Sequence, residues 1–356
     1  MILTINRGSS SVKFALFSPG KSPQRRLHGN VDPGKGIEAI LSHAAPDEIM
    51  AVGHRIVHGG GRFVQPTRID DSVIAGLREL FFLDPTHLPD EVATIEEVGK
   101  HLPDVPQFAC FDTAFFHDLP RVAQIVPVPR KFEEAGIRRY GFHGLSYQYL
   151  LGQLRQMKAA EGRIILAHLG NGASMAAVRD GKCIDTSMCF TPAAGIMMGT
   201  RPGDLDPGVI LQIMRSSGKS LEEMDHLLNF ECGLLGVSEI SSDVRQLLAH
   251  RASDPRAGEA IDLFCHIARK WIGSFAAELG GLQTLVFAGG IGENSAEIRA
   301  GICSQLEFLG VRLDAAANGR NAAVISAADG PCAVRVIKTD EESVIARAVC
   351  EVGGFS

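Results

Sequence analysis

The chain has 356 residues, and 35 Lys and Arg against 41 Asp and Glu give a formal net charge of −6 at pH 7. Its 45% hydrophobic and 21% charged residues exclude a disordered, collagenous or coiled-coil protein. A chain of this length is expected to form two domains, each with its own core. No run rich in Lys or Arg marks a surface for nucleic acid or an anionic membrane, so we expect neither partner.

Cysteine usage and the N-terminal sequence indicate the compartment. The eight cysteines are widely spaced without a Cys-x-x-Cys pair, which favours buried thiols in a reducing compartment over disulfides or a zinc site. The first residues lack a basic leader, and no apolar run approaches the length of a membrane span. We therefore expect a cytoplasmic protein.

Two strands are predicted at the start of the chain, Met1 to Asn6 and Val12 to Phe17, joined by a short polar loop. Small residues in such a loop let backbone N–H groups approach phosphate oxygens. The hydroxyls of Ser9 and Ser11 and the ammonium group of Lys13 would add donors. An ordinary surface turn is the alternative interpretation of this loop.

Four short segments set single Arg, Asp or His residues among glycines and apolar residues: Gly53–Gly60, Phe111–Phe115, Arg139–Gly144 and Met198–Asp204. A charge buried in this way needs a partner, so each segment is a candidate for function. Structural ion pairs, for example between Arg55 and Asp112, are the alternative. His54 and His58 have the spacing of a metal pair on a helix, but the glycines around them argue against a helix, and we reject this site.

The strand and loop pattern recurs in the second half of the chain. Arg163–Leu169 is predicted to be a strand, Gly170-Asn171-Gly172 a tight turn, and Ala173–Arg179 a second strand. Asp180-Gly181 then turns into a predicted third strand, Lys182–Thr186. Two such units about 160 residues apart suggest a duplicated domain.

A long helix is predicted between the N-cap Asp254 and Gly280, with Ile261, Phe264, Ala268, Trp271, Phe275 and Leu279 on its buried face. A capping box at Ser220–Glu223 and the pair Asp206-Pro207 each start another helix. Leu282–Ala288 is predicted to be a strand that runs into the glycine-rich loop Gly289–Asn294, after which Ser295 caps a helix of about three turns. Strands that alternate with helices indicate an α/β protein.

Three glycine-rich loops at strand ends favour a nucleotide-binding fold. A P-loop, a complete dinucleotide fingerprint and the protein-kinase signatures are all absent. Eight segments instead occur in this order: Asn6-x-Gly-Ser-Ser-Ser-x-Lys13, His54-Arg-x-Val-His-Gly-Gly60, Phe111-Asp-Thr-Ala-Phe115, Arg139-Tyr-Gly-Phe-His-Gly144, His168-Leu-Gly-Asn-Gly172, Met198-Gly-Thr-Arg201, Gly289-Gly-Ile-Gly-Glu-Asn294 and Thr339-Asp-Glu-Glu342. Through these segments the chain resembles the acetokinase (acetate kinase) family from residue 2 to about residue 347.

The resemblance implies two duplicated ribonuclease-H-like domains of the actin-like ATPase superfamily, with an interdomain cleft. The expected N-terminal domain is 1–147, joined by a C-terminal helix at about 340–356, and 148–339 is the expected nucleotide-binding domain. The implied reaction is reversible transfer of the ATP γ-phosphoryl group to acetate, which gives acetyl phosphate and ADP. A homodimer and Mg²⁺, with Mn²⁺ as the alternative metal, are also implied.

The resemblance further assigns roles to residues at matching positions. The implied catalytic residues are Arg55, Asp112, His143 and Arg201. The acyl group would contact Arg55, Val57, Thr86, Phe142 and Pro192. ATP would contact Lys13, His168, Gly170, Asn171, Gly172, Asp243, Arg245, Gly290, Ile291 and Asn294. Asn6 and Glu341 would belong to the metal site, where Glu342 is the alternative carboxylate.

The sequence also supports alternative interpretations. Asp243 and Arg245 are explained nearly as well by a helix cap and a surface arginine. Thr86 and Leu88 depart from the family pattern, and Pro202 follows Arg201 where the family usually has Ser. Since one methylene changes discrimination by about 1–3 kcal/mol, Thr86 could alter the preferred acid. A propionate or butyrate kinase, and an ATPase of this superfamily without acyl transfer, are therefore the alternatives.

Overall fold

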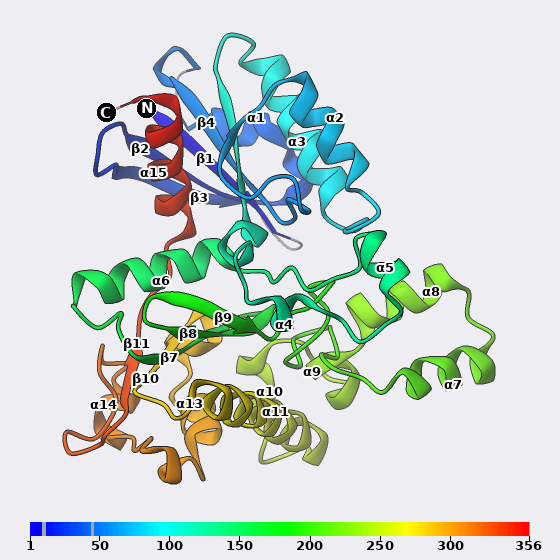
Figure 1. Cartoon of the computed structure of the whole chain (residues 1–356), viewed down its shortest axis with the longest axis vertical. Helices are drawn as coiled ribbons and strands as arrows, with labels where there is room; N and C mark the ends of the chain where they lie inside the picture. Colours follow the sequence, from blue (N-terminus) through cyan, green and yellow to red (C-terminus); the bar gives the residue numbers. More distant parts are fainter. Residues whose placement is uncertain (9–11, 44–45, 356) are drawn as a thin grey trace. The chain divides into compact units, whose positions relative to one another are not determined.

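The computed structural model of the chain describes residues 1–8, 12–43 and 46–355. They form two compact units (Figure 1). The first comprises Met1–Asp118, Phe142–Tyr149 and Asp340–Ser356, and the second comprises Leu119–Gly141 and Leu150–Thr339. These units group residues that pack mainly on one another, and the domain boundaries expected from the sequence remain a prediction.

The first unit is built on a six-stranded sheet with the order β3-β2-β1-β4-β6-β5. Its strands are β1 Ile2–Arg7, β2 Val12–Ser18, β3 Gln24–Val31, β4 Ala51–Ile56, β5 Thr67–Arg68 and β6 Gln107–Phe111. β1, β4 and β6 run parallel, whereas β2 is antiparallel to both of its neighbours. The two strands predicted at the start of the chain are confirmed as this antiparallel hairpin.

The second unit repeats this topology in a five-stranded sheet with the order β11-β10-β7-β8-β9. Its strands are β7 Arg163–Leu169, β8 Ala173–Arg179, β9 Lys182–Thr186, β10 Thr284–Ala288 and β11 Ala333–Val336. β8 is antiparallel to β7 and β9, and β7, β10 and β11 run parallel. Taken in the order β9, β8, β7, β10 and β11, these strands match β3, β2, β1, β4 and β6 of the first sheet in order and direction. This match confirms the predicted duplication.

Helices connect these strands. The α-helices are α1 Gly36–Leu41, α2 Asp71–Glu79, α3 Leu88–His101, α4 Arg121–Gln124, α5 Arg130–Glu134, α6 Gly144–Gln156, α7 Pro207–Ser217, α8 Leu221–His226, α9 Gly233–Ser238, α10 Val244–His250, α11 Pro255–Leu279, α12 Gly289–Asn294, α13 Ala296–Cys303, α14 Ala315–Gly319 and α15 Glu341–Gly353. Short 3₁₀ segments lie at η1 Pro33–Lys35, η2 Pro46–Glu48, η3 Asp112–Phe116 and η5 Glu307–Leu309, and a π-helical turn at η4 Leu227–Glu231.

Side-chain caps fix the predicted helix starts. Asp254 accepts a hydrogen bond from the Arg256 N–H at the start of α11, and the capping box of Ser220 and Glu223 starts α8. Ser295 caps α13, which has eight residues and is thus about one turn shorter than expected. On α11 the prediction for Trp271 is wrong, because it is half-buried and its neighbour Ile272 is fully buried instead.

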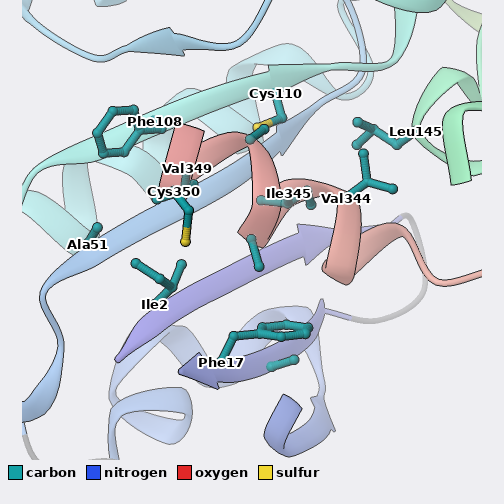
Figure 2. Packing of buried hydrophobic residues seen from close by; sticks show 13 residues of the cluster. Ile2, Phe17, Ala51, Phe108, Cys110, Leu145, Val344, Ile345, Val349 and Cys350 are labelled. Carbon is teal, nitrogen blue, oxygen red and sulfur yellow. The ribbon is translucent and has the colours of Figure 1, made fainter. Parts of the chain in front are cut away.

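The C-terminal helix α15 completes the core of the first unit. Figure 2 shows Val344, Ile345 and Val349 packed among residues of the sheet that include Ile2 and Phe108. Ile2 and the three residues of α15 come from opposite ends of the chain, and all five residues are nearly inaccessible to solvent. The start of α15, which carries Glu341 and Glu342, is therefore anchored to the sheet that carries Arg55.

Gly53 lets α15 lie close to β4. A methyl group at Gly53 would lie 2.5 Å from Ile345 Cγ2 and 2.6 Å from Val349 Cγ2. We expect Gly53→Ala to lower the free energy of unfolding in urea by about 1–3 kcal/mol, because the helix has to shift. The control is Gly273→Ala on α11, where the methyl group would meet no atom within 4 Å. That variant should gain about 0.5–1 kcal/mol. Equal stability of Gly53→Ala and the wild type would contradict this packing.

The eight cysteines are free thiols, and six of them are buried. Burial raises the pKa of the Cys110 thiol to about 12 and that of the Cys265 thiol to about 11. These thiols are therefore protonated at neutral pH. A search of the described residues for a helix with the length and hydropathy of a membrane span found none.

Candidate active site

Arg55 and Asp112 form a largely buried ion pair at the carboxyl ends of neighbouring strands, in which the Asp112 side chain is fully buried and that of Arg55 is 14% exposed. Arg55 is the fifth residue of β4, and Asp112 directly follows β6, which pairs in parallel with β4. Arg55 Nη2 and Nε lie 2.6 Å and 3.1 Å from Asp112 Oδ2. Burial disfavours the charged guanidinium, but Asp112, Glu341 and Glu91 outweigh this effect and raise the pKa of Arg55. The structure therefore contains the ion pair that the sequence offered as the structural alternative to function, and Arg55 is held as a cation.

Three oxygen-bearing side chains meet beside this pair. Asn6 Nδ2 donates to Glu341 Oε2 at 2.8 Å and to Glu342 Oε1 at 3.1 Å. Arg25 forms ion pairs with Asp340 and, at 4.0 Å, with Glu342. The predicted metal-site residues Asn6 and Glu341 are therefore in contact, although they are 335 positions apart in sequence.

The predicted acyl-contacting residues of the first unit are also ordered. Val57 is 4% exposed and follows β4. Phe142 is buried, and its ring forms a T-shaped contact with the ring of His58, the residue after Val57, at a centroid distance of 5.5 Å. Thr86 is half-buried, and its backbone N–H donates to Asp84 Oδ1 at 3.2 Å. The carboxylate of Asp84 thus fixes the loop that carries Thr86.

His143 has an unusual backbone conformation. Its φ of +62° lies in the left-handed region, which residues other than glycine rarely adopt. The next residue, Gly144, lies so close to Asp112 that a Cβ there would overlap the Asp112 carbonyl oxygen. The backbone N–H of Leu145 faces Asp112 Oδ1 at 3.4 Å. His143 therefore lies in the first unit, in a segment that contacts Asp112, and its backbone is strained.

The site region also contains a buried carboxyl group that was not predicted from the sequence. Glu91, in the first turn of α3, is 3% exposed, and both of its oxygens accept from the Val57 N–H at 3.0 Å and 3.2 Å. Glutamate next to Pro89 and Asp90 at a helix start is typical of a solvated first turn, so the sequence gives no signal of burial.

His54 and His58 each form a hydrogen bond through one ring nitrogen. His54 Nε2 contacts Gln107 Oε1 at 2.7 Å, and burial lowers the pKa of His54 to about 4, so the ring is neutral. His58 Nδ1 accepts from the Gly60 N–H. Throughout residues 1–8, 12–43 and 46–355, no three His, Cys, Asp or Glu side chains are arranged to hold a metal ion.

Lys13 lies opposite Asn6 in the β1–β2 pairing and is exposed. The hydroxyls of Ser9 and Ser11, which the sequence analysis added as phosphate donors, lie outside the described residues.

In the second unit, the turn between β7 and β8 meets the end of β10. The Gly170 N–H donates to the Gly172 carbonyl oxygen at 2.9 Å. A methyl group at Gly170 would lie 3.7 Å from His168 Nε2 and 3.9 Å from the backbone nitrogen of Gly290. Asn171 packs closely on Gly199, because a Cβ added at Gly199 would lie 2.2 Å from Asn171 Oδ1. The predicted nucleotide residues His168, Gly170 and Gly290 are therefore neighbours.

The expectation of a loop at Gly289–Asn294 is wrong, because these residues form the short helix α12 directly after β10. Gly289 makes this abrupt change possible with a φ of +76°, at a point where a methyl group would lie 2.7 Å from the Leu169 carbonyl oxygen. Asn294 Nδ2 donates to the Gly290 carbonyl oxygen at 2.9 Å. The buried Arg299 donates to the Gly292 carbonyl oxygen.

Two further predicted groups lie in the second unit. Arg201 Nη1 donates to the Pro192 carbonyl oxygen at 2.6 Å, which brings the predicted catalytic arginine to the predicted acyl-contacting proline. Asp243 caps α10 through the Arg245 N–H and pairs with the exposed Arg245 side chain at 2.6 Å. Asp243 is therefore a helix cap and Arg245 a surface arginine, as in the alternative interpretation of the sequence. A contact of the two residues with adenine remains a prediction.

The five-stranded topology that both units share, with candidate residues at the ends of its strands, defines an α/β protein of the actin-like ATPase fold. The model of the acetokinase family matches residues 35–347. The chain is 43% identical to an acetate kinase of Rhodopseudomonas palustris, over 98% of this chain and 97% of that protein. It is 46% identical to a propionate kinase of Citrobacter rodentium, over 99% and 96%.

The structure also resembles the crystal structure of Porphyromonas gingivalis acetate kinase, with a TM-score of 0.89 and 35% identity over 99% of both chains. The chain therefore belongs to the acetokinase family.

Proposed function

We propose that this chain transfers the γ-phosphoryl group of ATP reversibly to a short-chain carboxylate, with acetate as the leading acceptor, to give an acyl phosphate and ADP. The observation that carries the proposal is the buried Arg55–Asp112 pair beside Val57 and Glu341. Membership of the acetokinase family, with relatives named for acetate and propionate, supports the same reaction.

Arg55 is suited to an anionic acceptor. Asp112 engages two of the five guanidinium N–H donors, and the Arg7 carbonyl oxygen engages a third through Nη1. Two donors therefore remain, as far as the described part of the chain is concerned, for a carboxylate or phosphoryl oxygen. Because Asp112 and the Arg7 carbonyl fix the plane of the guanidinium, the acceptor would meet a preorganised cation.

In-line phosphoryl transfer needs positioning and charge neutralisation more than covalent chemistry. We assign Arg201 and His143 to the stabilisation of charge on the transferring group, and Asp112 to the orientation of Arg55. The strained backbone of His143 supports its assignment, since such strain is concentrated at functional sites.

On the nucleotide side, the contacts among His168, Gly170 and Gly290 support the proposed ATP-binding role of this region. We assign His168, Gly170, Asn171 and Gly172 to the phosphates, with Lys13 as a further cation. Gly290, Ile291 and Asn294 are assigned to the adenosine, and Asp243 and Arg245 to the adenine side.

Mg²⁺ fits the oxygen donors around Asn6, since it prefers oxygen ligands and often binds through one or two carboxylates plus phosphates and water. We assign Glu341 as the carboxylate, because Glu342 also pairs with Arg25. When bound there, the metal would neutralise charge on the ATP phosphates. Mn²⁺ is the alternative. The homodimer and the cytoplasmic location stay predictions, the latter supported by the free thiols.

The acceptor preference depends on Thr86. We expect Thr86→Leu to lower kcat/KM for propionate and butyrate relative to acetate by about tenfold, because the larger side chain removes space for one methylene. Thr86→Val keeps the side-chain volume and should leave the ranking of acids unchanged. Steady-state rates with the three acids measure this, and an unchanged ranking in Thr86→Leu would remove Thr86 from the acyl contacts.

Hydroxylamine trapping of acyl phosphate tests the proposed function. Purified protein with Mg-ATP and acetate, propionate or butyrate should yield the corresponding hydroxamate. The 46% identity to a propionate kinase makes propionate the second candidate acceptor. ATP hydrolysis that is indifferent to every acid would replace the proposal with the superfamily ATPase.

A further inference from the structure

Glu91 is a buried carboxyl group whose hydrogen-bond partner is a main-chain N–H rather than a cation. Both of its oxygens face the backbone N–H of Val57, at 3.0 Å and 3.2 Å. Val57 directly follows β4, two residues after Arg55. Glu91 therefore fixes the backbone of an acyl-contacting residue from the side of α3.

The charges around Glu91 come from several elements. Arg55 on β4 faces three carboxyl groups: Glu91, Asp112 and Glu341. Asp84, before α3, and Asp112 also face Glu91, and Asp84 is itself faced by His87 and His58. Because Glu341 is assigned to the metal, Glu91 and Asp112 are the two of these groups that face Arg55 alone, and with both ionised they would carry two negative charges against its one positive charge. An acceptor carboxylate would be repelled from such a site.

We propose that Glu91 is a positioning residue that is protonated while the acceptor is bound, so that it holds the Val57 backbone without competing for the charge of Arg55. The inference rests on the proposed function, because it concerns the acceptor side of the same site. A neutral carboxyl group still accepts the Val57 N–H through its carbonyl oxygen. Asp112 then remains the charged partner of Arg55, and a neutral Glu91 does not compete with the acceptor for the positive charge of Arg55.

The electrostatics of the site agree with this role. Burial raises the pKa of Glu91 to about 8, although Arg55 and the Val57 N–H oppose the shift, and Asp84 and Asp112 add to it. A group with a raised pKa is neutral below that pH and ionised above it. The negative charge of Glu91 should therefore oppose acceptor binding only in alkaline solution.

The pH dependence of KM for acetate tests the inference. With saturating Mg-ATP, the wild-type KM should rise by up to about tenfold between pH 7 and pH 9, as the neutral fraction of Glu91 falls. Glu91→Gln keeps an acceptor for the Val57 N–H and cannot ionise, so its KM should stay flat over this range. The matched control is Glu97→Gln, on the same helix, where Glu97 accepts from the Ile37 N–H at 2.9 Å. This control should retain the wild-type profile.

Glu91→Ala separates positioning from charge. It removes the acceptor of the Val57 N–H, so KM for acetate should be raised at every pH. A flat wild-type KM between pH 7 and pH 9, or a Glu91→Gln profile that rises like the wild type, would overturn the inference. The pH dependence of the wild-type KM tests the inference even if the Glu91 variants do not fold. Absence of acyl phosphate from the wild type with every acid would instead mean that the proposed function fails.

Discussion

Arg201→Ala is expected to lower kcat for acyl phosphate formation by about 10³-fold, the lower end of the effect of arginines that stabilise charge in phosphoryl transfer. Arg201 is already oriented, since Nη1 donates to the Pro192 carbonyl oxygen at 2.6 Å. KM for ATP should change much less than kcat, because the interaction strengthens as charge develops on the transferring group. Hydroxamate formation at saturating acetate measures this effect.

The control for this variant is Arg215→Ala, which removes an exposed arginine from α7 in the same unit. It should retain the wild-type rate. A loss in Arg201→Ala of less than about tenfold, with the fold intact, would remove Arg201 from the catalytic machinery.

Asp112→Asn is expected to impair both stability and activity. The carboxylate of Asp112 is fully buried, and replacing it by an amide leaves the charge of Arg55 buried without its partner. Breaking a buried pair in this way costs about 3–5 kcal/mol of unfolding free energy. Because Arg55 also loses its orientation, kcat/KM for acetate should fall by at least about 100-fold. Urea unfolding and the hydroxamate assay measure the two effects.

An exposed ion pair provides the comparison for Asp112→Asn. Arg251 Nη2 and Asp262 Oδ1 are 2.7 Å apart, which is close to the Arg55–Asp112 distance, but both side chains are exposed. Asp262→Asn should change the unfolding free energy by no more than about 1 kcal/mol. Equal changes in the unfolding free energy for the two substitutions would show that burial of the Arg55–Asp112 pair contributes little to stability.

Elements with strong local signals could be predicted from the sequence. The turns at Gly170–Gly172 and Asp180-Gly181 predict the antiparallel strands β7, β8 and β9, and Asp254 with Gly280 predicts the ends of α11. The segment Gly289–Asn294 was assigned wrongly, because its glycines indicate a loop when local propensity alone is considered. Its helical form depends on the close approach of Gly289 to Leu169, which is a tertiary contact.

The candidate site was predictable to a similar degree. Arg55 and Asp112 could be considered as a pair because each is a charged residue in a segment of small and apolar residues, and the parallel pairing of β4 with β6 brings them together. The contact of Asn6 with both Glu341 and Glu342 requires the packing of α15 on β1. Glu91 could not be found, since its burial depends on how α3 packs on β4 and not on its sequence neighbours.

The most direct test of the central claim is the ratio of acyl phosphate to ADP formed by the wild type with Mg-ATP and acetate, with hydroxylamine as the trap. Transfer to the carboxylate predicts about one hydroxamate per ADP and little ADP when the acid is omitted. ADP formation at the same rate with or without acetate, and without hydroxamate, would mean that the phosphoryl group passes to water, and it would contradict the proposed acyl transfer.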